Sequence, residues 1–134
     1  MKITFYWCDN NNLLYPLCNS NMTNQDGVDP ICCLLMDDGG IPYNETLSWI
    51  QDGLKEINSV LNGEQLSSSW SREAWEASFT KSLSKIYSLY DESCFEEIST
   101  KDLKEILNAW CEFLTSKPLP KEKVFWCNNQ EEKS

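Results

Sequence analysis

The densest group of reactive side chains in this chain is a run of carboxylates within SLYDESCFEEIST, residues 88–100. The carboxylates are Asp91, Glu92, Glu96 and Glu97. Such groups can perform acid–base hydrolysis, coordinate a divalent cation or contact a basic protein surface. A solvated turn would carry the same residues with no function at all. The remaining residues help to separate these alternatives.

Catalysis is disfavoured because none of the 134 residues is a histidine. Histidine is the commonest general base and the usual partner of a serine or cysteine nucleophile, so most arrangements for nucleophilic catalysis are excluded. The phosphate-binding patterns G-x-x-x-x-G-K-[ST] and G-x-G-x-x-G are also missing. Acids are abundant in this chain, so some of them will lie close together without a catalytic role. We therefore expect that the protein is not an enzyme.

Metal binding lacks its usual ligands. Without histidine, a zinc site would need four thiolates, and the sequence contains no Cys-x-x-Cys pair. The acidic stretch lacks the central glycine and the regular ligand spacing of a calcium-binding loop. We expect neither a metal nor a cofactor.

The charge of the chain indicates a protein partner. There are 21 acidic and 11 basic side chains, giving a net charge of −10, and Arg72 is the only arginine. Between Lys2 and Lys55 every charged residue is acidic. We therefore expect repulsion from nucleic acid and from anionic membranes, and attraction to a basic protein.

The compartment follows from two further features. No stretch approaches the roughly 18–20 apolar residues needed to span a bilayer, and MKITFYWCDNNN lacks the features of a secretory signal. We expect a cytoplasmic protein, whose cysteines are reduced thiols that are mostly buried as small apolar side chains. The cysteines are Cys8, Cys18, Cys32, Cys33, Cys94, Cys111 and Cys127.

In the N-terminal third, two strands are predicted. Residues 2–7 are β-branched and aromatic, which favours a strand. Residues 9–30 are rich in Asn, Asp, Ser and Gly and predict a long loop that holds one short extended piece, LLYPLC. The run ICCLLM, residues 31–36, ends at a DDGG turn and predicts a second strand, buried on both faces.

Two amphipathic helices are predicted from apolar residues at spacings of three and four. The first covers residues 44–61 and stops at Asn62-Gly63. The second begins at Ser99, whose hydroxyl can cap it, and ends before Pro118. Their apolar stripes are Leu47, Ile50, Leu54, Ile57 and Leu61 in the first, and Leu103, Ile106, Leu107, Trp110 and Leu114 in the second.

Between the helices, alternating residues predict a hairpin of two strands, residues 75–80 and 85–90. A helix over residues 72–90 is the alternative, because this stretch begins with several helix-favouring residues. After the second helix, Val124 to Cys127 form an apolar cluster that can add an edge strand, and residues 128–134 are expected to be a flexible tail. The whole chain, residues 1–134, is predicted to be one α+β domain, with a single antiparallel-rich sheet and both helices packed on one face.

Acids and aromatic residues meet at two turns of this predicted fold, one after residues 31–36 and one before the final helix. Aromatic side chains can anchor a protein contact while carboxylates raise its association rate. The alternative is that the aromatic residues face the core and the acids face water. Because Glu96 and Glu97 precede a helix start, they also suit the helix dipole, so Asp91 and Glu92 test a partner surface more cleanly. The predicted partner-binding residues are Asp91, Glu92, Glu96, Glu97, Asp37, Asp38, Tyr90 and Trp70.

Three stretches within residues 36–115 carry a resemblance: MDDGGIPYNETLSWIQDGLKEINSVLNGEQ, WSREAWEASFTKSLSKIYSLYDE and EISTKDLKEILNAWCEFL. Their order resembles bacterial immunity proteins of polymorphic toxin systems, including contact-dependent growth inhibition. The shared features are a Gly-x-Pro turn before a Leu-x-x-Trp-Ile helix, a Trp-Ser strand, and a final helix ending in Trp-x-x-Phe-Leu. The matching positions are Gly40, Pro42, Trp49, Ile50, Trp70, Ser71, Trp110, Phe113 and Leu114.

This resemblance implies an inhibitor that binds the C-terminal domain of a cognate toxin. Many such toxins are nucleases with basic active clefts, so an acidic inhibitor can place carboxylates where phosphates would bind. The alternative, from a different class, is an acidic secretion chaperone or adaptor that binds a segment of a protein partner through an apolar groove.

Overall fold

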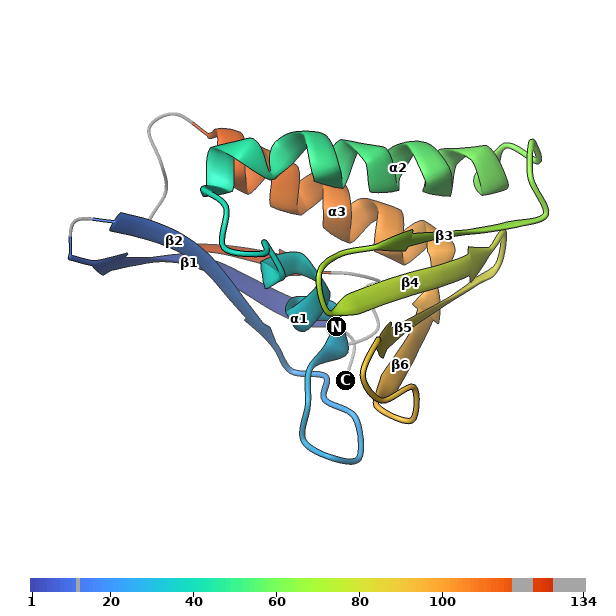
Figure 1. Ribbon diagram of the computed structural model, residues 1–134, viewed down its shortest axis with the longest axis horizontal. Coiled ribbons are helices and arrows are strands. Elements are labelled where there is room, and N and C mark those ends of the chain that lie inside the picture. Colours follow the sequence, from blue (N-terminus) through green and yellow to red (C-terminus); the bar gives the residue numbers. More distant parts are fainter. Residues whose placement is uncertain (12, 117–121, 127–134) are drawn as a thin grey trace.

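The computed structural model describes residues 1–11, 13–116 and 122–126 and has an α+β fold with two antiparallel sheets (Figure 1). One sheet has the order β2-β1-β7, with β1 (Lys2–Asn10), β2 (Leu13–Ser20) and β7 (Glu122–Trp126). The other has the order β3-β4-β5-β6, with β3 (Ser67–Ser71), β4 (Trp75–Thr80), β5 (Leu83–Ser88) and β6 (Phe95–Ser99). The helices are α1 (Pro30–Met36), the short 3-10 turn η1 (Tyr43–Glu45), α2 (Leu47–Leu61) and α3 (Thr100–Thr115).

The prediction of a single sheet is wrong, because the strands form two sheets. The prediction of two helices is also wrong, because α1 is a third helix. The sheets diverge below the pair α2 and α3, with α1 between them (Figure 1). The strands β1 and β2 pair with each other, none of the described strands joins them to β3–β6, and β7 pairs with β1 from a distant part of the sequence. Pairing between strands so distant in sequence leaves no local pattern that periodicity can detect.

The two long helices are confirmed. The apolar positions of α2 and α3 face the interior, and Ile57 and Leu103 are fully buried. The predicted cap is also present, because the Asp102 N–H donates to the Ser99 hydroxyl oxygen at 3.1 Å. The helix ends at Thr115, before Pro118 as predicted.

The predicted strand over residues 31–36 is wrong, because this segment is the helix α1. Asp29 caps it, with the Cys32 N–H donating to Asp29 Oδ1 at 3.2 Å, and Pro30 occupies the first turn. A short run of apolar residues has the same pattern in a buried strand and in a buried helix, so the Asp-Pro start is the only local signal.

The hairpin in the middle of the chain is confirmed as β4 and β5, with Ala77 opposite Ile86, and the alternative helix is wrong. Of the two flanking strands, β3 contains Trp70 and Ser71, where the resemblance implies a strand, whereas β6 was not predicted. The extended piece LLYPLC belongs to β2, which is longer than expected and pairs with β1 along its length. The apolar cluster near the C-terminus contributes β7, while Cys127 and residues 128–134 lie outside the described residues.

Aromatic side chains connect the three-stranded sheet to α3. The Phe5 ring meets the Trp110 ring edge-on at 5.1 Å between centroids, and Trp7 stacks on Phe113 at 5.0 Å. On the other side of the core, α2 passes so close to Trp70 that a Cβ on Gly53 would lie 2.6 Å from the Trp70 ring. Glycine at this position therefore allows the close packing of α2 on β3.

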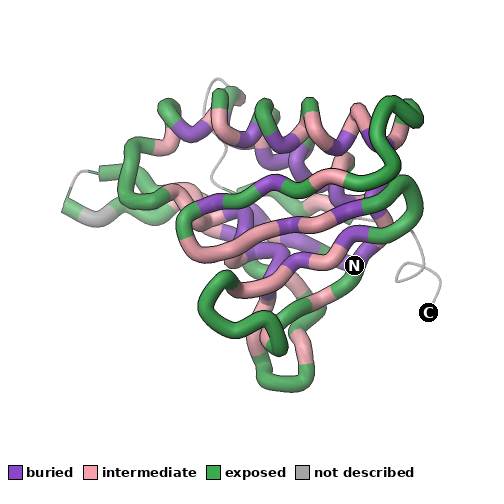
Figure 2. The backbone as a smooth tube through the Cα atoms, turned by 45° about the vertical axis from the view of Figure 1, so that its right-hand side comes forward, coloured by how far each residue is buried: buried purple, intermediate pink, exposed green. Residues whose placement is uncertain are grey.

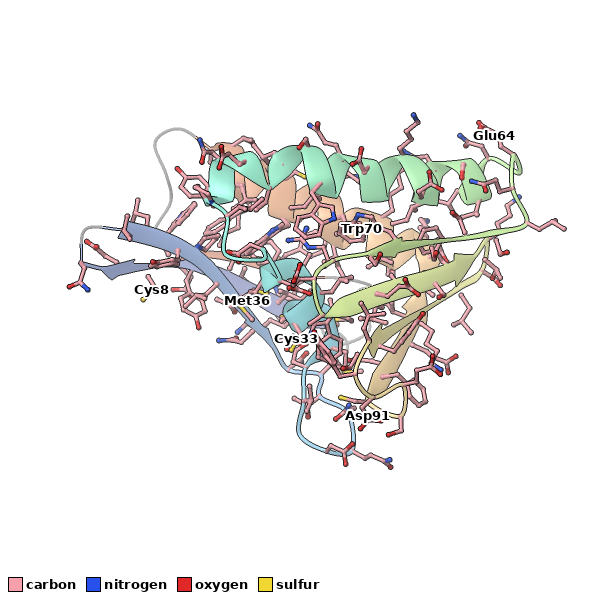
Figure 3. All side chains as sticks on the ribbon, viewed as in Figure 1. Cys8, Cys33, Met36, Glu64, Trp70 and Asp91 are labelled. Carbon is pink, nitrogen blue, oxygen red and sulfur yellow. The ribbon has the colours of Figure 1, made fainter. Side chains whose placement is uncertain are left out.

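The described cysteines form no disulfide. Cys18 and Cys32 are buried, as expected of small apolar side chains, but Cys8 is exposed near the end of β1 (Figure 3). Within the described residues, no helix combines the length and hydropathy required to cross a membrane.

Candidate partner-binding surface

Two loops far apart in the sequence form one acidic end of the molecule, which we call the acidic tip: residues 21–29 and residues 89–97. The Asn24 side-chain amide donates to Cys94 Sγ at 3.6 Å and so joins the two loops. Both lie at the lower end in Figure 1, and most of their residues are exposed in Figure 2. The tip contains six acids and no lysine or arginine. The acids are Asp26, Asp29, Asp91, Glu92, Glu96 and Glu97.

The turn between β5 and β6 is held by its own hydrogen bonds. Asp91 Oδ1 accepts from the backbone N–H and from the hydroxyl of Ser93, at 3.1 Å and 2.6 Å. These bonds lower the pKa of the Asp91 carboxyl, so it remains ionised at neutral pH. The Ser88 N–H donates to the Cys94 carbonyl at 3.1 Å and closes the turn. The Asp91 carboxylate is therefore presented from a fixed backbone.

The loop over residues 21–29 is organised around Asn24 and Asp29. The Asp26 and Val28 N–H groups donate to Asn24 Oδ1, at 2.9 Å and 3.1 Å. Asp29 Oδ2 accepts from the hydroxyl and the N–H of Ser20, at 2.8 Å and 3.0 Å. Asp29 thus fixes this loop to β2 while it caps α1, and its carboxylate serves the fold.

Glu96 and Glu97 separate because neighbouring residues of a strand point to opposite faces. Glu97 is exposed and lies opposite Lys85 in the register of β6 on β5. Glu96 is half-buried on the inner face, where its Oε1 has no hydrogen-bond partner among the described residues. Burial, and after it the charge of Asp29, raise the pKa of Glu96 to about 7.

Apolar side chains stand among the carboxylates of the tip. Tyr90 is 84% exposed, and Met22, Leu89 and Phe95 are 43%, 44% and 39% exposed. Exposed aromatic and aliphatic groups beside charges are typical of the centre of a protein interface, where they supply contact area. The predicted residues Tyr90, Asp91 and Glu92 thus lie together and are accessible.

Asp37, in contrast, belongs to a structural cluster that we call the latch: Asp37, Arg72 and the two tryptophans that enclose Arg72. Asp37 Oδ2 accepts from the N–H groups of Ala74 and Trp75, at 2.6 Å and 3.0 Å, and the Asp37 carbonyl accepts from Arg72 Nε at 2.7 Å. Arg72 also donates to the Leu35 carbonyl at 3.4 Å, so it satisfies carbonyls at the end of α1.

The remaining partners of Arg72 are aromatic. Its guanidinium lies 4.6 Å from the centre of the Trp49 ring and 5.3 Å from that of the Trp70 ring. Desolvation in this place lowers the pKa of Arg72 to about 10, which still leaves the group charged at neutral pH. Trp70 is only 6% exposed and donates to the Trp49 carbonyl at 3.1 Å. Figure 3 shows Trp70 beneath α2, well away from Asp91. Trp70 is therefore a core residue of the latch.

Asp38 lies elsewhere again, although it is adjacent to Asp37. It lines a groove between the start of β2 and residues 38–44, with a volume of about 550 Å³. Asp38 Oδ1 accepts from the Gly40 N–H at 2.8 Å and so forms the DDGG turn. The eight predicted residues consequently fall into three places: the tip, the latch and this groove.

Sequence reasoning missed the loop at residues 21–29 and the apolar groove wall at residues 13–16. Both fall within the stretch that lacks basic residues, and LLYP is an apolar run inside an otherwise polar segment. Those signals were present, but only the folded chain shows which of these segments adjoin Asp91 and which adjoin Asp38.

Among the residues that the structure describes, no group of three or more Cys, Asp or Glu side chains is arranged to hold a metal ion. No family model matches the chain, and neither a curated protein nor a solved structure matches it. The resemblance to immunity proteins therefore rests on the sequence of residues 36–115 alone.

Proposed function

We propose that this chain is an immunity protein that binds the C-terminal domain of a cognate toxin, a basic nuclease, and occludes its active cleft. The observation that carries the proposal is the acidic tip, where the exposed side chains of Asp91 and Glu92 stand beside the highly exposed Tyr90. The carboxylates would occupy the positions of substrate phosphates, and Tyr90 would supply the apolar anchor.

The fixed backbone of the tip supports this function. The turn at residues 88–94 is closed by internal hydrogen bonds, and the Asn24 to Cys94 contact braces it against a second loop. A preformed surface loses little conformational entropy on binding, which favours a tight complex. Lys85 of β5 stands beside Phe95 and Glu97, with its ammonium 4.7 Å from the centre of the Phe95 ring, but residues 21–29 and 89–97 contain no lysine or arginine, so the charges of Asp91 and Glu92 can act together on a basic partner.

The experiment is a comparison of two double charge reversals, each of which changes the net charge by the same amount. Asp91→Lys with Glu92→Lys alters the tip, and Asp52→Lys with Glu64→Lys alters exposed positions on and after α2. The partner is the protein encoded by the adjacent reading frame, and stopped-flow kinetics at low salt measure association.

We expect the tip variant to associate at least about tenfold more slowly, with a smaller difference at high salt, and the control variant to change much less. Equal rates for the two variants would mean that net charge acts without any special role of the tip. Failure of the adjacent protein to bind, or to kill cells that lack this chain, would contradict the immunity function.

The secretion chaperone is the second candidate, because the groove beside Asp38 has an apolar lining suited to a protein segment. Deleting the gene separates the two functions. Loss of export of the neighbouring protein would support the chaperone, whereas death of the cell caused by that protein would support immunity.

A further inference from the structure

The groove beside β2 is lined by side chains whose exposure the fold leaves unexplained. Leu13, Tyr15 and Ile41 are 58%, 42% and 39% exposed, and all three line the groove together with Asp38. Its volume of about 550 Å³ falls within the range of roughly 300–1,000 Å³ that is usual for binding sites. The groove lies on a different part of the chain from the acidic tip.

One wall of the groove is preformed. Gly39 and Gly40 both have positive φ, 63° and 84°, and this backbone turns the chain so that the Ile41 N–H donates to the Asp38 carbonyl at 3.2 Å. The Thr46 N–H and hydroxyl both donate to the Tyr43 carbonyl, at 3.1 Å and 2.7 Å. The Tyr43 ring also packs edge-on against Trp7, with 4.8 Å between centroids. Tyr43 is thereby fixed to the aromatic core.

The opposite wall is the edge of β2, and its backbone shows that an occupant is not held by backbone hydrogen bonds along this edge. The Cys18 N–H donates to Met36 Sδ at 3.4 Å and the Ser20 N–H to Asp29 Oδ2 at 3.0 Å, so even-numbered residues of β2 point their backbone groups away from β1. Pro16 shares this orientation and has no N–H. The outward edge is thus occupied or blocked at three successive positions, and a partner strand cannot extend the sheet along it.

The charge around the groove is acidic. Asp9 lies opposite Leu14 in the register of β1 on β2, Asp38 lines the groove, and Glu45 follows the lining residue Asn44. Arg72 lies in a small cavity that shares Pro16, Asp38 and Tyr43 with the groove lining. It is buried, its Nε and Nη2 donate to carbonyls, and its charge attracts that of Asp38. Asp38 is the one charged side chain among the residues that line the groove, and its charge favours a cationic occupant.

We propose that this groove binds a segment of a partner protein in which an apolar side chain is flanked by lysine or arginine. The apolar side chain inserts between β2 and residues 41–43, and the flanking cation pairs with Asp38. Asp38 Oδ1 holds the turn, and Asp38 Oδ2 is the oxygen available for that cation within the described structure. The inference rests on the proposed function only in taking the partner to be a basic protein, and it adds a second contact distant from the tip.

The experiment uses three capped tetrapeptides, Lys-Leu-Trp-Lys, Glu-Leu-Trp-Glu and Lys-Ser-Ser-Lys, added to the ¹⁵N-labelled full chain. Amide chemical shifts report where each peptide binds, and no toxin is required. We expect Lys-Leu-Trp-Lys alone to shift the amides of residues 13–15, 41, 43 and 44. Lys-Ser-Ser-Lys, which has charge without an apolar anchor, is expected to act only at the acidic tip.

Two substitutions test the contacts, each with a matched control. Ile41→Ser should weaken binding of Lys-Leu-Trp-Lys about fivefold, and Leu66→Ser, at a residue that is 95% exposed outside the groove, should leave it unchanged. Asp38→Asn should weaken it about threefold at low salt, and Asp52→Asn should not. Asparagine can still accept from Gly40, so the turn is retained in this variant.

Three outcomes would overturn the proposal. Equal shifts of the groove amides by all three peptides would mean that the groove does not select an apolar side chain flanked by cations. Equal shifts by free indole would indicate a small-molecule pocket. Shifts of the same amides with protein concentration, without peptide, would mean that a second copy of this chain covers the groove. None of these outcomes bears on the association kinetics of the tip variants, so failure of the groove and failure of the immunity function are distinguishable.

Discussion

The acidic tip and the latch use the same side chain for opposite purposes. In the latch, the Asp37 carboxylate accepts from the N–H of Ala74, which precedes β4, and from the N–H of Trp75, which begins it, while the Asp37 carbonyl accepts from Arg72. In the tip, the Asp91 carboxylate accepts only from Ser93, two residues further along the chain. The carboxylate that bonds to a distant segment holds the fold together, whereas the one with a local partner stays exposed at the surface. The predictions below test this difference.

The largest effect is expected in the latch, for Arg72→Ala. The substitution leaves the Leu35 and Asp37 carbonyls without their donor and opens a void between Trp49 and Trp70. We expect a loss of about 2–4 kcal/mol in the free energy of unfolding, measured with urea. The neighbouring exposed residue provides the control, and Glu73→Ala should change stability by less than about 0.5 kcal/mol. A small effect of Arg72→Ala would show that the latch is dispensable.

A smaller loss of stability is expected for Asp37, and almost none for its neighbour Asp38. Asp37→Asn should lower the free energy of unfolding by about 1–2 kcal/mol, because a neutral amide is a weaker acceptor for the two N–H groups. Asp38→Asn should change it by less than about 0.5 kcal/mol, since its bond to Gly40 is local and exposed. Urea unfolding of both variants at the same pH measures this difference. Equal losses in the free energy of unfolding would contradict a structural role for Asp37 that Asp38 lacks.

Glu96 gives a pH-dependent effect at the boundary of the tip. Its pKa is raised from 4.5 to about 7, so the folded chain binds this proton more tightly than the unfolded chain does. The stabilisation from this group is therefore fully present below pH 4.5 and is lost as the pH rises to about 7. Replacing the carboxyl by a neutral amide, Glu96→Gln, removes that loss.

We therefore expect Glu96→Gln to be more stable than the parent chain at pH 8 by about 1–2 kcal/mol, a figure reduced for the solvent that still reaches this half-buried group. The difference should shrink towards acidic pH. Glu97→Gln is the matched control on the outer face of β6, and its stability relative to the parent should not vary with pH in this way. Unfolding curves at several pH values measure the stability of both variants. The same pH dependence in both would mean that the Glu96 carboxyl is as solvated as that of Glu97.

The smallest effect on stability is expected at the exposed tip. Asp91→Asn with Glu92→Gln should leave the urea midpoint unchanged, because both carboxylates are exposed and the turn retains its backbone hydrogen bonds. A lower midpoint would show that these charges serve the fold, as those of the latch do, and would weaken their assignment to a partner.

Local patterns in the sequence predicted the parts of the fold that depend on neighbouring residues. The apolar stripes of α2 and α3 and the alternation in β4 are repeated along one element, so each could be recognised without knowledge of its surroundings. The segment ICCLLM has no such repeat, and the prediction of a strand there is wrong. Asp29 and Pro30, a cap and a first-turn proline, are the local signal that favours a helix. The pairing of β7 with β1 completes the three-stranded sheet, and no local pattern predicts it because the two strands lie far apart in the sequence.

The candidate site was predictable to a lesser extent. Composition could identify Asp91 and Glu92 as charged residues near aromatic ones, but the different orientations of Glu96 and Glu97 depend on β6, which was not predicted. Trp70 was expected at the surface for its proximity to acids in the sequence, yet it faces inward from β3 onto Gly53. Contacts between distant segments determine which carboxylates stabilise the fold. Such contacts cannot be read from local patterns in the sequence.

The pairing of β1 with β7 also has a consequence for synthesis on the ribosome. Lys2 lies opposite Trp126 and Tyr6 opposite Glu122, so the nascent chain contains β1 long before its second neighbour is translated. During that time one edge of β1, which carries Ile3 and Phe5, lacks the strand that completes its sheet. The strands β3 to β6 follow one another in sequence and can pair as they emerge. The strands β3 to β6 can therefore complete their sheet as they emerge, whereas the other sheet is completed only after β7 has been translated.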